Sequence, residues 1–164
     1  MIKALIHNSQ GASSSTSILQ QVDLTGIDLM FLPYCHLENA LALRRKYGVN
    51  INWKATTDVA DNIGLCVMSK EDTTIDLKVA NIPVDHNNPY NSNRFMLFDY
   101  QGIKMCHAVR QPNALYDAIY LRDIERHMPH LVLGENIGLE DPNVIVMKES
   151  YTDNGITYVN FELA

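Results

Sequence analysis

Residues 28–33 read Asp-Leu-Met-Phe-Leu-Pro, and residues 2–8 read Ile-Lys-Ala-Leu-Ile-His-Asn. Both stretches are short and nearly continuous in apolar character, which is typical of strands in a sheet that is covered on both faces. Proline has no N–H to donate to a strand ladder, so the second strand is expected to end at Pro33. The two stretches therefore predict a buried sheet near the start of the chain.

Helices and further strands are expected to surround this sheet. Ser and Thr at 13–17 offer N-caps for a first helix, residues 36–47 predict a second that ends at Gly48, and Pro112 begins a third that reaches about His127. The apolar faces of the three helices are expected to carry Ile18, Leu19 and Val22; Leu37, Ala40, Leu41 and the stem of Arg44; and Leu115, Ala118, Ile119 and Ile124. Further strands are predicted at 63–68, 74–82, 94–100, 103–109, 131–133, 144–147 and 156–161, with turns at 101–102 and 153–155.

The composition is that of a folded protein with a sizeable core. The chain has 164 residues, of which 46% are hydrophobic and 20% charged, and no repeat, linker or charge block divides it. We therefore expect one domain over residues 1–164, in the α/β (α+β) class, with mixed β-sheets flanked by helices.

Charge and cysteine usage limit the classes of partner and the compartment. The formal charge of −6 disfavours non-specific affinity for nucleic acid, which would need a local basic patch or a metal. No apolar stretch is long enough to span a bilayer, and the N-terminal run becomes polar after six residues, so neither a membrane helix nor a signal peptide is expected. Cys35, Cys66 and Cys106 lie in or beside apolar runs and predict buried thiols in a reducing, cytoplasmic compartment, without structural zinc.

Five segments, in this order, end in polar residues: 2–8 before Gln10-Gly11, 28–32 before Pro33-Tyr34, 63–70, 94–107 and 131–137. The last reads Leu-Val-Leu-Gly-Glu-Asn-Ile. The order and spacing resemble the endonuclease/exonuclease/phosphatase superfamily, the deoxyribonuclease I-like proteins, over roughly residues 1–137. The resemblance implies a truncated four-layer α/β/β/α sandwich.

Several positions depart from the pattern of that superfamily. In the family, a Glu after the second strand holds a divalent cation, and a Gly-Asp-x-Asn motif positions the nucleophile and the scissile phosphate. Here Tyr34 stands in place of that Glu, Glu135 in place of the Asp and Ile137 in place of the Asn. A phenol with a pKa of about 10 is a poor ligand for a hard cation. The family also ends with an Asp-His pair, and residues 131–164 contain no histidine.

The resemblance implies a small set of candidate site residues. Asn8, His107, Glu135 and Asn136 are the candidate catalytic residues, in vestigial form, and Glu38 and Glu135 are the candidate metal ligands. Each has an alternative structural role: Asn8 as a turn residue, His107 as a hydrogen-bonded core histidine, and Glu38 as a partner of the helix dipole.

Residues 83–93 predict a surface loop that is rich in Asn. Tyr90 and Asn91 in this loop, together with Tyr34, are candidates for contacts with a partner, because tyrosine supplies contact area at low entropic cost. The same composition is also typical of an ordinary exposed turn.

The sequence is compatible with two functions. The first is a catalytically impaired member of the superfamily, a pseudoenzyme that requires no cofactor and binds another protein, for example as an inhibitor or decoy of a nucleic-acid enzyme; a phage origin would suit so short a domain. The alternative is a reduced but active phosphodiesterase or nuclease that uses Mg or Mn. In that case Asn8, Glu38, His107, Glu135 and Asn136 would form the site.

Overall fold

Strands of the chain form two β-sheets, described here from a computed structural model that covers residues 1–55, 62–79, 94–109, 114–135 and 137–164. The first sheet has the order β10-β11-β1-β2-β4-β3, with β1 (Ile2–Ile6), β2 (Leu29–His36), β3 (Asn50–Ala55), β4 (Ile63–Ser69), β10 (Ile145–Asp153) and β11 (Ile156–Leu163). The second has the order β5-β6-β7-β8-β9, with β5 (Thr74–Val79), β6 (Arg94–Tyr100), β7 (Ile103–Val109), β8 (Leu131–Glu135) and β9 (Ile137–Glu140). Both sheets are mixed, since β1 pairs with β2 and β7 with β8 in parallel while their other pairs are antiparallel.

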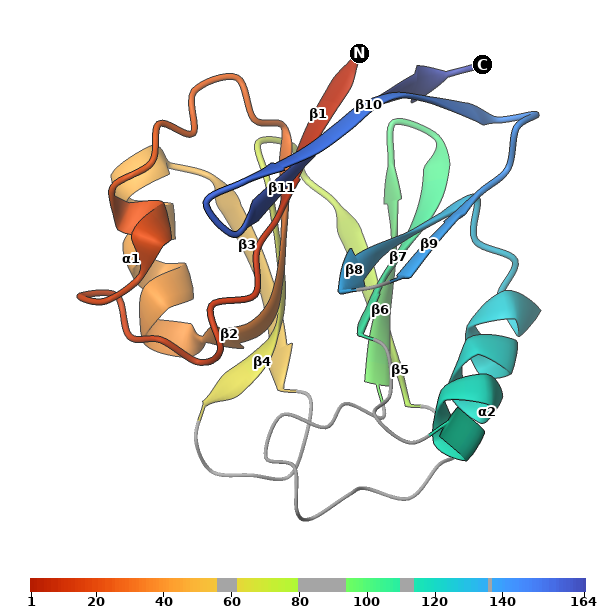
Figure 1. The fold of residues 1–164 in the computed structure, drawn as a ribbon, viewed down its shortest axis with the longest axis horizontal. Coiled ribbons are helices and arrows are strands. Elements are labelled where there is room, and N and C mark those ends of the chain that lie inside the picture. Colours follow the sequence, from red (N-terminus) through yellow and green to blue (C-terminus); the bar gives the residue numbers. More distant parts are fainter. Residues whose placement is uncertain (56–61, 80–93, 110–113, 136) are drawn as a thin grey trace.

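The two sheets pack face to face, and a helix covers the outer face of each (Figure 1). A single apolar cluster joins the inner faces, and in it the rings of Phe31 on β2 and Phe98 on β6 lie 5.8 Å apart between centroids. The outer face of the first sheet carries α1 (Leu37–Tyr47) and the 3-10 turn η1 (Ile18–Gln20), and α2 (Ala114–Arg126) lies against the second sheet. This arrangement confirms the predicted four-layer α/β/β/α sandwich. Among the described helices, none is long and apolar enough to cross a membrane.

Two tight turns form as their sequences predict. Gln101 and Gly102 have φ values of 49° and 80°, and Asn154 and Gly155 have values of 53° and 76°. A two-residue hairpin turn of type I′, whose twist matches that of the flanking strands, needs a positive φ at both central residues. Asn and Gly adopt such φ values at low cost. These turns close the β6–β7 and β10–β11 hairpins.

Helix α1 has the predicted limits but not the predicted buried face. The N-cap His36 accepts a hydrogen bond at Nδ1 from the N–H of Glu38, and Gly48 ends the helix with a φ of 63°. Asn39 is fully buried, because its amide bonds to Ser17 and Gln20, while Leu41 is 36% exposed. A satisfied amide can replace an aliphatic side chain in a core, which the apolar pattern cannot reveal.

Other expectations for the secondary structure were wrong. Strand β2 continues through Pro33 to His36, because its register against β4 shifts between Leu32 and Cys35 and the proline lies where the ladder is interrupted. The first helix is only the turn η1, capped by Ser17. In α2, Ile124 is buried as predicted, but Ala118 and Ile119 are exposed, since Tyr120 and Asp117 complete the buried face, and the Leu115 side chain lies outside the described residues. Strands β3 and β9 were not predicted.

Strand β8 continues through Gly134, where the sequence predicts its end. Gly134 pairs with Ala108 of β7, and a Cβ added at Gly134 would lie 1.6 Å from the Ala108 carbonyl oxygen. The backbones thus approach too closely for any side chain. Gly138 in β9 has room for a side chain, because no atom lies within 4 Å of a Cβ added at this position.

We expect Gly134→Ala to lower the free energy of unfolding by about 1–3 kcal/mol or more, because Ala108 and its strand must move. Gly138→Ala is the matched control and should change this free energy by less than about 0.5 kcal/mol. Urea denaturation of both variants makes the comparison. Equal midpoints for the two variants would contradict the close approach of β7 and β8.

Candidate functional site

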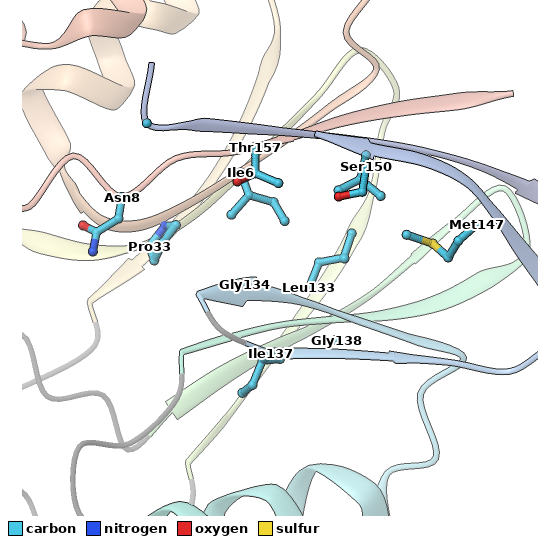
Figure 2. A pocket seen from close by; sticks show the side chains of 12 residues that line it. Ile6, Asn8, Pro33, Leu133, Gly134, Ile137, Gly138, Met147, Ser150 and Thr157 are labelled. Carbon is cyan, nitrogen blue, oxygen red and sulfur yellow. The ribbon is translucent and has the colours of Figure 1, made fainter. Parts of the chain in front are cut away.

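A cleft of about 410 Å³ opens where strands of the two sheets meet at one rim of the sandwich (Figure 2). The first sheet supplies residues from β1, β2, β10 and β11, and the second supplies β8 and β9. The lining residues are Ile6, Asn8, Pro33, Leu133, Gly134, Ile137, Gly138, Met147, Ser150, Gly155, Thr157 and Val159. Figure 2 shows Ile6 and Leu133 projecting into the space between the two sheets.

The described lining of this cleft is neutral. Its polar side chains are those of Asn8, Ser150 and Thr157, and the remaining residues are aliphatic, Met, Pro or Gly. The Asn8 Oδ1 atom accepts a hydrogen bond of 2.8 Å from the N–H of Gln10. Asn8 therefore has both predicted features, since it shapes the turn after β1 and also lies in the cleft.

Tyr34 lies in the core rather than on a contact surface. Its side chain is 8% exposed and belongs to the cluster between the sheets. Its φ of 52° lies in the left-handed region, and its carbonyl accepts a hydrogen bond of 2.8 Å from Gly11. The contact of Tyr34 with a partner stays a prediction, and the burial of the residue fits a role in the core. The other two proposed contact residues, Tyr90 and Asn91, lie outside the described residues, as does Asn136.

His107 is fully buried in β7, between the two sheets. Its Nδ1 atom lies 3.2 Å from the Leu133 carbonyl oxygen, and its ring meets Phe31 edge-on with centroids 5.4 Å apart. Burial lowers the pKa of His107 from 6.5 to about 4, although the carbonyls of Leu133 and Leu32 partly favour the charged form. The imidazole is therefore a neutral core group near pH 7. The catalytic role of His107 stays a prediction, and its burial outside the described lining of the cleft fits the alternative of a hydrogen-bonded core histidine.

We expect the neutral state of His107 to make the fold sensitive to acid. The unfolded chain binds a proton near pH 6.5, whereas the folded chain resists it until about pH 4, so stability falls as the pH decreases through this interval, by up to about 3 kcal/mol. His107→Leu should flatten the dependence between pH 6.5 and 4, measured by urea denaturation at several pH values. An unchanged slope in the variant would show that other groups cause the acid sensitivity.

The two proposed metal ligands are not brought together by any described contact. Glu38 is exposed in the first turn of α1, accepts a hydrogen bond of 3.0 Å from Ser14, and lines a separate hollow with His36 and Arg45. Glu135 ends β8 beside Gly134, so its backbone reaches the cleft rim, but its side chain is not described. Within the described part of the chain, no three His, Cys, Asp or Glu side chains are grouped as a metal site would need. The position of Glu38 fits the alternative role of dipole partner.

The three cysteines are buried, as their sequence context predicts. Burial raises the pKa of the Cys66 and Cys106 thiols well above the usual value. These two thiols are therefore held in the protonated form and are poor nucleophiles.

Sequence reasoning missed the contribution of the C-terminal hairpin to the cleft. Met147 and Ser150 on β10 and Thr157 on β11 reach it because β11 pairs with β1. Their signal in the sequence is only the strand pattern around the Asn154-Gly155 turn. That pattern predicts a hairpin but not the strand on which it docks.

Comparisons with solved structures agree with this topology. The crystal structure of D. rerio TDP2, humanized by 14 mutations, aligns with 98% of this chain and 98% of its own, at a TM-score of 0.61 and 11% identity. Truncated Caenorhabditis elegans TDP2 aligns with 89% of this chain and 68% of its own, at a TM-score of 0.51 and 11% identity. Like TDP2, this chain has the deoxyribonuclease I-like fold. A further structure of C. elegans TDP2 shares it at a TM-score of 0.52, and there the chain spans 52% of the other protein's length.

No protein-family model matches the sequence, and no curated protein sequence matches it significantly. At 11% identity the structural likeness establishes the deoxyribonuclease I-like fold alone. The function must therefore be inferred from the residues of the cleft.

Proposed function

We propose that this chain is a non-catalytic protein of the deoxyribonuclease I-like fold that acts by binding another protein at the cleft. The observation that carries the proposal is the neutral lining of the cleft, in which the described side chains include no carboxylate, imidazole or cation. Phosphodiester hydrolysis needs groups that stabilise developing negative charge and activate water. Amide and hydroxyl groups such as those of Asn8 and Thr157 are instead suited to recognition by hydrogen bonding.

Two core residues strengthen this proposal. Tyr34 occupies the position of the metal-binding Glu in the family pattern, and it is buried between the sheets. His107 occupies the position of the strand-end histidine, and it is buried as well. Both side chains stabilise the sandwich and contribute nothing to the cleft. The net charge of −6 favours a partner with a basic surface, as an inhibitor or decoy of a nucleic-acid enzyme would need.

One observation favours the alternative of an active phosphodiesterase that uses Mg or Mn. Gly134 lines the same cleft as Asn8, and Glu135 follows it directly. Glu135 ends β8 next to this cleft residue, and its carboxylate is the candidate ligand of the alternative. The alternative therefore depends on Glu135.

We expect no hydrolysis of bis-p-nitrophenyl phosphate or single-stranded DNA above the buffer rate, with Mg or Mn present, because the described cleft offers no grouped ligands for the ion. Glu135→Ala should behave like the unmodified chain in this assay, and Glu149→Ala on β10 is the matched carboxylate control. Metal-dependent turnover that Glu135→Ala abolishes and Glu149→Ala preserves would overturn the proposal and establish the alternative.

A further inference from the structure

Strand β9 is an open edge beside the cleft. It is the last strand of its sheet and pairs only with β8 in the strand order. Its residues are half-buried at Ile137 and exposed from Gly138 to Glu140, with Leu139 49% exposed. Outside the sheet ladders, residues 137–140 form no backbone hydrogen bond with another residue of the described chain. An edge of this kind presents unpaired N–H and C=O groups to an added strand.

Hollows lie on both faces of the second sheet next to this edge. On the α2 face, a hollow of about 250 Å³ is bounded by residues that include Leu121, Val132 and Leu139. On the inner face, Glu140 and Met147 help to bound one of about 180 Å³. Gly138 lines both hollows and also the main cleft. Because Gly138 has no side chain, the space beside Leu133, its partner on β8, stays open.

This pattern matches the needs of a bound extended peptide. Successive side chains of a strand point to opposite faces of its sheet, so a strand added to β9 would direct alternate side chains into the two hollows. The backbone ladder supplies affinity and the hollows supply selectivity for side chains.

The charges at the edge indicate the chemistry of the occupant. Each hollow has one charged lining residue, which is Glu125 on the α2 face and Glu140 on the inner face. Neither hollow is lined by a described basic side chain. A segment with aliphatic side chains and a lysine or arginine on each face would complement this surface. A second copy of the chain would instead bring its own Glu140 to the edge and raise like-charge repulsion.

The edge at β10 provides a contrast within the same protein. Its register against β11 shifts between Met147 and Glu149, and Lys148 forms an ion pair with Glu162 at 2.9 Å. Bulges and lysines are devices that keep an edge from pairing with other chains. The four residues of β9 include neither a lysine nor a proline.

We propose that β9 is the docking strand of this protein, and that it binds an extended segment of its partner carrying aliphatic side chains and a basic side chain on each of its two faces. The inference rests on the proposed binding function and names the partner's chemistry and the strand that receives it. The main cleft continues this surface through Gly138, so a partner on β9 also reaches the cleft.

A display library of random octapeptides, panned against the full chain, tests the proposal. The enriched sequences should combine aliphatic residues with lysine or arginine. Capped synthetic forms should shift the amide resonances of residues 137–140 in a titration followed by NMR. Absence of enrichment, or shifts confined to residues away from β9, would overturn the proposal.

Two pairs of variants with matched chemistry sharpen the test. Leu139→Lys places a positive charge on the proposed edge and should weaken peptide binding by about tenfold or more. Val146→Lys, at a position 37% exposed on β10, should change it by less than about twofold. Glu140→Gln should weaken binding and reduce its salt dependence, and Glu149→Gln should not. Equal effects at β9 and β10 would refute docking on β9.

The outcomes separate this inference from the proposed function. Binding of the library peptides that maps elsewhere, without metal-dependent hydrolysis, would reject the β9 site and retain a binding protein. Metal-dependent hydrolysis that needs Glu135 would reject the proposed function whatever the peptides do. Self-association in solution that Leu139→Lys abolishes would assign the edge to a second copy and overturn the choice of partner.

Discussion

The apolar contact between the inner faces of the two sheets is the constraint on which the rest of the molecule depends. Phe31 and Phe98 meet across it, and residues of β1, β2, β4, β6, β7, β8, β10 and β11 or their ends contribute to the same cluster. Burial of this surface holds the sheets at one orientation. The ends of β1 and β8 then lie at one rim, where the cleft forms. The location of the cleft is therefore a consequence of core packing.

The same core buries two side chains whose positions in the sequence correspond to reaction-centre residues in the family pattern. Tyr34 and His107 are both buried between the sheets, where a phenol adds apolar area and a neutral imidazole replaces an aliphatic group. Burial strongly lowers the pKa of His107, because a charged imidazole would lose its hydration there. What remains at the cleft is a neutral described lining of apolar side chains and glycines with the amide of Asn8 and the hydroxyls of Ser150 and Thr157. A deoxyribonuclease I-like frame thus persists around a site whose described residues suit recognition better than hydrolysis.

The short second sheet adds a different property. It ends at β9, a strand of four residues with a glycine at its second position. The glycine leaves space beside Leu133 on one face, and it lines the hollows on both faces of the sheet next to the edge. Recognition through a sheet edge needs few specialised side chains, since the backbone makes the principal contacts.

The sequence by itself determined the α/β class with mixed sheets, both tight turns, the limits of α1 and the burial of the cysteines, whereas the four layers were expected only from the resemblance to the deoxyribonuclease I-like proteins. These features follow from local chemistry: apolar runs, capping residues, and Asn or Gly where φ must be positive. The tertiary structure alone decided the path of β2 through Pro33, the inward position of Asn39, and the existence of β9. It also decided that Ser150 and Thr157 share a cleft with Asn8, while Glu38 lies elsewhere. Each of these depends on a partner distant in the chain, whose position no local pattern contains.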